Sequence, residues 1–191
     1  MEILNKAINF AVKYHDGAFR KGTTMPYIVH PMEAGVIASS LTNDLEVISA
    51  SILHDVLEDT SATKKEVEEV FGKRVLELIL SDTEDKMMHL SASSSWETRK
   101  QATLDELLNA TYDEQIICLA DKLSNMRAIY RDYLVLKDKL WERFNQKDKA
   151  KQGWYYTEIA NRLTLLKRTP AHDEYLLLLS RVFSDNEVKI D

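Results

Sequence analysis

The segment SILHDVLEDT, residues 51–60, places four ionisable residues inside an apolar helical pattern: His54, Asp55, Glu58 and Asp59. Residues four apart share a helix face, so Glu58 would lie one turn beyond His54 and Asp59 one turn beyond Asp55. An isolated buried carboxylate loses roughly several kcal/mol or more of hydration. A bound metal ion, a salt-bridge network or plain solvent exposure would each compensate this cost. For Glu58 and Asp59 taken alone, a solvated helix end is the simpler interpretation.

Two positions elsewhere change that balance. His30, in PYIVHPMEA, precedes a predicted helix and is badly placed for a core histidine, and Asp121, in IICLADKLSNM, directly follows a strongly apolar stretch. A buried carboxylate of this kind binds a metal or a neighbouring cation, here Lys122 or Arg127. The combined donor set is His30, His54, Asp55 and Asp121. Two imidazoles and two carboxylates suit a six-coordinate Mn²⁺ or Fe²⁺, with Zn²⁺ as an alternative.

Three segments, in this order along the chain, carry a family resemblance: RKGTTMPYIVHP, ILHDVLEDT and LADKLSNMR. Together they resemble the hydrolase domain of RelA/SpoT-type alarmone enzymes, a member of the HD superfamily of metal-dependent phosphohydrolases. The resemblance extends over roughly residues 5–130. A further segment, SWETRKQATLDEL, is similar to the stand-alone small alarmone hydrolases.

The resemblance implies a role for each candidate residue. It implies that the two imidazoles and two carboxylates hold one Mn²⁺, and that Glu58 and Asp59 position and activate the attacking water. It also implies that Arg20, Lys21 and Asn125 lie around the nucleotide. Arginine is suited to bidentate phosphate contact or to stacking on a base, and asparagine can donate and accept hydrogen bonds.

The function implied is a metal-dependent (p)ppGpp 3′-pyrophosphohydrolase that releases pyrophosphate and GDP or GTP. Within the same class, an HD phosphohydrolase acting on another nucleotide, such as a nucleoside monophosphate or NADPH, stays an alternative. A catalytically silent module that binds nucleotide or a partner protein is a different class. A silent module predicts an eroded ligand set, whereas all four candidate ligands and both water-side carboxylates are present.

The elements that position these residues are predicted to be helices, which makes the fold class all-α. Apolar residues recur at helical spacing, and five glycines and three prolines supply few turns for a β fold. We expect an HD-domain helical bundle with a C-terminal helical extension, forming a single domain over 1–191 with its core at about 1–135 and C-terminal helices at about 136–191. Capping boxes are predicted at Thr63–Glu66 and Ser94–Glu97. The predicted helices cover 4–12, 31–41, a helix capped at 42–44 that ends with 51–60, 64–71, 73–80, 96–110, 113–133, a helix containing 132–144, 148–167 and a last helix after Pro170. The segment 81–95, which contains Met87 and Met88, is the longest predicted loop.

Composition narrows the class of protein further. A net charge of −6 argues against a nucleic-acid partner and leaves room for a small anionic substrate. The single cysteine, Cys118, excludes a disulfide within the chain. The N-terminal segment is unlike a signal peptide, and no apolar run approaches the roughly 20 residues that cross a bilayer, so we expect a cytoplasmic protein without membrane partners. Aromatic residues in the C-terminal helices suit packing in the core or at an interface between subunits. A homo-oligomer therefore stays an alternative to a monomer.

Overall fold

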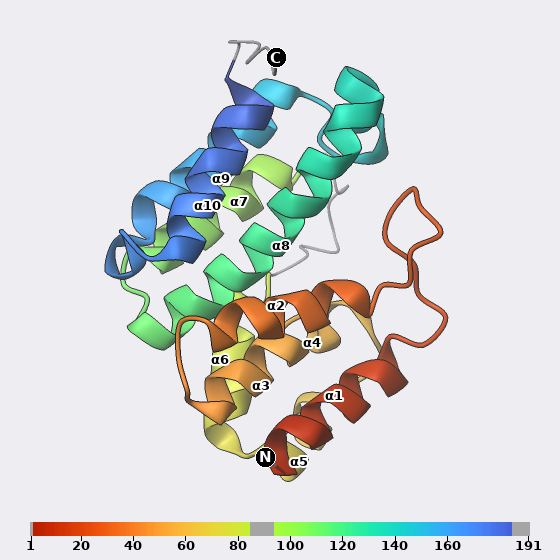
Figure 1. Ribbon diagram of the computed structural model, residues 1–191. Helices are drawn as coiled ribbons and strands as arrows, with labels where there is room; N and C mark the ends of the chain where they lie inside the picture. Colours follow the sequence, from red (N-terminus) through yellow and green to blue (C-terminus); the bar gives the residue numbers. More distant parts are fainter. Residues whose placement is uncertain (1, 85–93, 185–191) are drawn as a thin grey trace.

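The computed structural model describes residues 2–84 and 94–184, and helices make up most of them (Figure 1). In chain order the α-helices are α1 (Glu2–Tyr14), α2 (Val29–Ser39), α3 (Leu45–Leu53), α4 (Val56–Asp59), α5 (Lys64–Phe71), α6 (Lys73–Asp82), α7 (Trp96–Leu107), α8 (Tyr112–Leu136), α9 (Lys149–Arg162) and α10 (Pro170–Phe183). Two 3₁₀ helices, Lys137–Arg143 and Thr164–Leu166, connect the last three. The described part of the chain contains no β-strand, which confirms the predicted all-α class. None of its helices has the length and apolarity needed to cross a membrane.

Local sequence signals set many of the helix ends. Thr63 and Glu66 form the predicted capping box at the start of α5, and Gly72, with φ of 85°, ends that helix. Asp44 caps α3 by accepting the N–H of Glu46 at 2.9 Å. The helix predicted from Pro31 begins two residues earlier, so that Pro31 lies in the first turn of α2, where its missing N–H costs nothing.

Three local predictions are wrong. The helix that carries residues 51–60 is not continuous, because α3 ends at Leu53 and α4 begins at Val56, leaving His54 and Asp55 at the break. No α-helix contains residues 132–144: Lys137 has a φ of 52°, which ends α8 and starts a 3₁₀ helix.

The third error concerns α7. Ser95, not Ser94, is the N-cap residue of this helix, and its side chain makes no capping hydrogen bond. Along the predicted loop 81–95, α6 continues to Asp82, while Met87 and Met88 lie outside the described residues.

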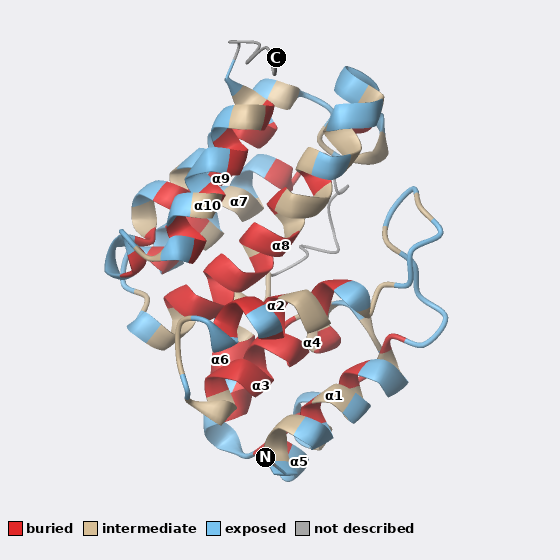
Figure 2. Ribbon diagram, viewed as in Figure 1, coloured by how far each residue is buried: buried red, intermediate tan, exposed pale blue. Residues whose placement is uncertain are grey.

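Helix α8 is the central element of the structure. It contacts α2, α3 and α6 from the N-terminal part of the chain and α10 from the C-terminal part (Figure 1). The buried residues of α2, α3 and α8 face one another in one apolar core (Figure 2). The prediction of a single domain, with a core at about 1–135 and C-terminal helices at about 136–191, stays a prediction.

A glycine allows α2 and α3 to approach closely. A Cβ atom added at Gly35 would lie 2.5 Å from Cγ1 and 2.9 Å from Cδ1 of Ile52. No side chain fits in that space, so the backbone of α2 rests directly on Ile52 of α3. The contact matters for function because His30 is carried by α2 and His54 directly follows α3.

We predict that Gly35→Ala destabilises the fold even though alanine is the better helix former. The propensity gain of about 1 kcal/mol is outweighed by overpacking, which costs about 1–3 kcal/mol. Chemical denaturation should therefore show a net loss on the order of 1 kcal/mol. In an Ile52→Ala background, which removes the clashing carbons, the same substitution should raise stability. Losses that simply add in the double variant would contradict this packing.

Candidate metal centre and substrate cavity

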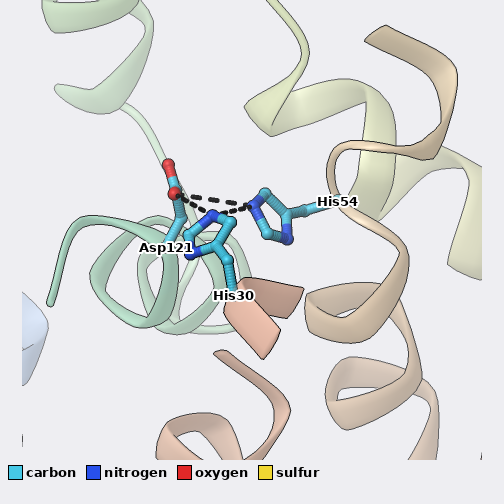
Figure 3. Close-up of side chains that lie close together, drawn as sticks. All are labelled: His30, His54 and Asp121. Atoms are coloured by element: carbon cyan, nitrogen blue, oxygen red, sulfur yellow. Dashed lines mark hydrogen bonds and ion pairs between the residues drawn. The ribbon is translucent and has the colours of Figure 1, made fainter. Parts of the chain in front are cut away.

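Four side chains from three separate parts of the chain converge at one point: His30 from the first turn of α2, His54 and Asp55 from the break between α3 and α4, and Asp121 from the middle of α8. The two imidazole Nε2 atoms are 3.2 Å apart. Oδ1 of Asp121 lies 3.1 Å from Nε2 of His30 and 3.5 Å from Nε2 of His54 (Figure 3). Oδ2 of Asp55 lies 3.4 Å and 3.1 Å from the same two nitrogens.

This geometry fits a metal site. Nitrogen and oxygen ligands lie about 2.0–2.2 Å from a small divalent ion, which places neighbouring ligands about 3–3.5 Å apart. His30, His54 and Asp121 are only 3 %, 2 % and 5 % exposed, and their donor atoms form a cluster able to hold one ion. Two imidazoles and two carboxylates packed this closely suit binding of one shared cation. They suit it better than they suit four core residues that are each satisfied by a separate hydrogen-bond partner.

The outer nitrogen of each imidazole is fixed by a hydrogen bond that turns Nε2 toward the centre. Nδ1 of His54 donates to the backbone carbonyl of Ser51 at 2.8 Å, since a carbonyl can only accept. Nδ1 of His30 lies 2.8 Å from Oγ of Ser124, and that hydroxyl donates to Glu33 at 2.7 Å. Because the serine hydrogen points to Glu33, Nδ1 of His30 carries the hydrogen shared with Ser124. A hydrogen on Nδ1 leaves Nε2 of His30 as the nitrogen that can offer a lone pair to a metal ion.

The charges of the cluster shift its pKa values in opposite directions. Burial opposes the charge on His54, but the carboxylates of Asp55 and Asp121 outweigh it and hold the pKa of His54 well above its usual value. Burial likewise opposes ionisation of Asp55, but His54 and His30 hold the pKa of this carboxyl well below the usual range. For Asp121, Lys122 and the two imidazoles overcome burial and lower the pKa in the same way. A metal ion would therefore have to displace a proton from a metal-free site whose carboxylates are already ionised.

Asp121 also has a cationic neighbour. The ammonium of Lys122 contacts its Oδ2, the oxygen that does not face the imidazoles. Arg127, the other cation predicted as a partner of Asp121, binds elsewhere. It donates two hydrogen bonds of 2.7 Å to Glu174 of α10 and one of 3.1 Å to Glu33. Lys122 thus balances part of the charge while Oδ1 stays directed at the cluster.

The two candidate water-side carboxylates lie on α4, next to the cluster. The hydroxyl of Tyr27 lies 2.5 Å from Oδ2 of Asp55 and 3.2 Å from Oδ2 of Asp59, so these two acids lie on one side of the site. Glu58 accepts the backbone N–H of Glu84 at 3.3 Å, which connects α4 to the end of α6. The one-turn spacing predicted for Asp55 and Asp59 holds although the helix is broken, because the N–H of Asp59 donates to the carbonyl of Asp55.

The three candidate substrate contacts also gather beside the cluster. Arg20 donates to Oδ1 of Asn125 at 2.7 Å, and Nδ2 of Asn125 donates to Oδ1 of Asp121 at 2.6 Å. Lys21 is exposed and donates to Asn145 at 3.1 Å. All three line a cavity of about 180 Å³ that opens next to the candidate metal ligands.

Sequence reasoning missed two residues that the C-terminal part of the chain adds to this cavity. Arg143 and Tyr156 line it, and an adjoining cavity of about 230 Å³ is lined by cations and aromatic rings. The adjoining cavity contains Lys21, Arg99, Lys100, Lys122, Tyr155 and Tyr156. Tyr155 and Tyr156 are buried in the core, as predicted for the aromatic residues of the C-terminal helices, and they also line this cavity. No spacing in the sequence indicates this second position, because it depends on the packing of α9 against α7 and α10.

We predict that Ser124→Ala weakens binding of a divalent metal, with Mn²⁺ as the probe in calorimetry. Loss of the hydrogen bond that orients a metal-binding histidine typically costs about 10–100-fold in affinity. Ser49→Ala is the matched control, since Oγ of Ser49 is buried without a hydrogen-bond partner in the described structure. Equal affinities for the two variants would contradict the orienting role of Ser124.

We also predict that Mn²⁺ affinity increases with pH above the ordinary imidazole pKa of about 6.5. His54 keeps its proton to higher pH than a free imidazole, so the ion competes with that proton until pH exceeds the raised value. Calorimetry in buffers of different ionisation enthalpy should show proton release on binding. An affinity that stays constant from about pH 6 to about pH 9 would contradict the assignment of His54 as a ligand.

This chain is similar to known proteins in sequence and in fold. The model of the HD domain family matches residues 7–165. A GTP pyrophosphokinase from Myxococcus xanthus is 36% identical over 132 residues, covering 68% of this chain and 17% of that protein. The guanosine-3′,5′-bis(diphosphate) 3′-pyrophosphohydrolase MESH1 of Danio rerio is 34% identical over 134 residues, covering 68% of this chain and 70% of that protein. The chain thus spans 17% of the length of the first of these relatives.

Two solved structures share the fold. A metazoan ortholog of SpoT, described as hydrolysing ppGpp, matches 95% of both chains with a TM-score of 0.74 at 22% identity. The crystal structure of lmo0812 from Listeria monocytogenes EGD-e matches 86% of this chain and 99% of that one, with a TM-score of 0.67 at 30% identity. These findings confirm the helical fold and the resemblance to RelA/SpoT-type hydrolases. Since the family match extends over residues 7–165 and the Danio rerio relative is matched over 70% of its length, this chain belongs to the HD domain family.

Proposed function

We propose that this protein is a metal-dependent 3′-pyrophosphohydrolase of guanosine 3′,5′-bis(diphosphate) and its pentaphosphate relative, releasing pyrophosphate and GDP or GTP. The observation that carries the proposal is the convergence of His30, His54, Asp55 and Asp121 beside a cavity lined by cations. The similarity to MESH1, whose name states this reaction, supports the choice of substrate. A nucleotide substrate is a small anion, in keeping with the acidic chain and its locally basic cavity.

We propose that the resident ion is Mn²⁺, held by the two imidazole Nε2 atoms and by Oδ atoms of Asp55 and Asp121. Mixed nitrogen and oxygen donors suit Mn²⁺. When bound, such an ion supplies positive charge that polarises a phosphoryl oxygen and acidifies water. The possible metal cluster found among the described residues, and the metal dependence of HD domain hydrolases, support a divalent ion of some kind at this position.

We propose that Glu58 and Asp59 act as the proton acceptors. In this reaction the oxygen of water bonds to the phosphorus next to the ribose, and the bond from that phosphorus to the 3′ oxygen breaks. The water loses a proton as it attacks, and a carboxylate within reach is a suitable base. The role of Asp59 is supported by its position beside Asp55. The role of Glu58 is supported by its place on the same short helix, where its carboxylate accepts the backbone N–H of Glu84.

We propose that Arg20, Lys21 and Asn125 bind the nucleotide. Arg20 and Asn125 hydrogen-bond to each other, so both polar groups are satisfied and a substrate would have to replace one partner. The guanidinium also lies over the ring of Tyr27, 5.5 Å from its centroid, so Arg20 is held at the mouth of the site. Lys100, which pairs with Glu84, and Lys122, which pairs with Asp121, also line the adjoining cavity, where phosphate oxygens could compete for these ammonium groups.

The test is pyrophosphate release from guanosine 3′,5′-bis(diphosphate), with and without Mn²⁺. We expect metal-dependent release by the wild type and a loss on the order of 10²–10³-fold or more in Asp55→Ala, because this substitution removes a charged ligand. Asp105→Ala, which removes an exposed carboxylate on α7 that is bonded to Gln101, should behave as wild type.

A wild type that is folded and binds Mn²⁺ but releases no pyrophosphate would overturn the substrate assignment. Nucleoside monophosphates and NADPH should be assayed in parallel. Turnover of one of them instead would identify an HD phosphohydrolase of another nucleotide, and no turnover of any would identify a silent binding module.

A further inference from the structure

Tyr27 lies beside the candidate metal ligands and contacts two of the acidic residues there. It lies between α1 and α2, where its N–H donates to the carbonyl of Ala18 at 2.9 Å. Its own carbonyl accepts the N–H of His30 at 3.0 Å, at the start of α2. The backbone of Tyr27 is thus fixed on both sides, and one of these contacts is to a candidate metal ligand.

The ring of Tyr27 is held as firmly as its backbone. His15 packs beside it with the ring centroids 4.9 Å apart, and His30 meets it edge-on at 5.9 Å. Arg20 covers the ring from a third direction. A ring enclosed in this way has little rotational freedom, so the direction of its hydroxyl is set before any ligand binds.

The hydroxyl of Tyr27 is directed at two carboxylates with different proposed roles. It donates to Oδ2 of Asp55 at 2.5 Å, and this is the oxygen that faces the Nε2 atoms of His30 and His54. The same phenol oxygen lies 3.2 Å from Oδ2 of Asp59. A carboxylate oxygen has two lone pairs, so Oδ2 of Asp55 can accept from Tyr27 and still bind a metal ion.

We propose that Tyr27 is a positioning residue: its hydroxyl donates to the metal-facing oxygen of Asp55 and fixes it, and its phenol oxygen lies where it can accept a hydrogen bond from a protonated Asp59. For Asp55 the consequence is a ligand oriented before the ion arrives, as outer hydrogen-bond partners do for metal ligands in general. For Asp59 the consequence is a phenol oxygen 3.2 Å from its Oδ2, which can accept a hydrogen bond from the carboxyl once Asp59 has taken a proton. The part that concerns Asp59 rests on the proposed function, whereas the part that concerns Asp55 depends only on the metal site.

The experiment compares Tyr27→Phe with Tyr14→Phe. Both substitutions remove one tyrosine hydroxyl that donates to a carboxylate, but Tyr14 bonds to Glu66 at 2.8 Å, and Glu66 caps α5 rather than joining the metal cluster. Mn²⁺ affinity is measured first, by calorimetry and without substrate. We expect Tyr27→Phe to bind about 10–100-fold more weakly than wild type and Tyr14→Phe to bind equally well.

Turnover of guanosine 3′,5′-bis(diphosphate) is then measured at saturating Mn²⁺. Tyr27→Phe should lower kcat by at least about 10-fold with KM changed by less than about twofold, because Asp59 would act on the water rather than on substrate binding. In an Asp59→Asn background the further loss from Tyr27→Phe should largely disappear, since the tyrosine would act through that carboxylate.

Three results would overturn the proposal: an unchanged Mn²⁺ affinity in Tyr27→Phe, an equal loss in Tyr14→Phe, or a Tyr27→Phe protein that does not fold. The last contradicts a positioning role because the phenylalanine keeps every ring contact. If the wild type does not hydrolyse the substrate at all, the proposed function fails, but the comparison of Mn²⁺ affinities still decides the role of Tyr27 at Asp55.

Discussion

The site depends on one constraint: two imidazoles and two carboxylates meet where three of them, His30, His54 and Asp121, are buried and Asp55 is partly buried. Each group alone, if charged, would lose hydration free energy of several kcal/mol on burial, roughly as much as the net stability of a domain. Together they compensate one another partially, with the pKa of His54 raised and those of Asp55 and Asp121 lowered. A divalent cation at the proposed site would complete the compensation, because it would replace a shared proton with a charge that all four donors could reach at once.

The arrangement of the helices follows from bringing those donors together. Asp121 lies midway along α8, the helix that contacts both the N-terminal and the C-terminal helices. Gly35 lets α2 rest on α3, which brings His30 toward His54. The break between α3 and α4 releases His54 and Asp55 from a regular helix, and Ser51 uses its carbonyl to orient the imidazole. The chain of contacts from His30 through Ser124 and Glu33 to Arg127 then ties one ligand to Glu174 on α10.

Much of this could be predicted from the sequence, and the failures have physical causes. Helical spacing and the Thr63–Glu66 capping box act over a few residues, so they gave correct helices and a correct cap. Residue types and their local context indicated the four candidate ligands, and the order of three motifs gave the family resemblance that assigns them to one ion; their roles stay proposals. The break at His54 was missed because nothing in ILHDVLED disfavours a helix; tertiary packing bends the chain there. The change at Lys137 was missed for a similar reason, since a positive φ at a lysine has no sequence signal. Tyr27, Arg143 and Tyr156 reach the site through contacts between distant segments, and a single sequence does not encode such contacts in any local pattern.

The most direct test of the metal site is anomalous diffraction from crystals of the wild-type protein grown with Mn²⁺. A single anomalous peak about 2.0–2.3 Å from Nε2 of His30, Nε2 of His54 and one oxygen each of Asp55 and Asp121 would establish the predicted coordination. A fully occupied ion bound elsewhere, or no ion at these four atoms under conditions where calorimetry shows binding, would contradict it.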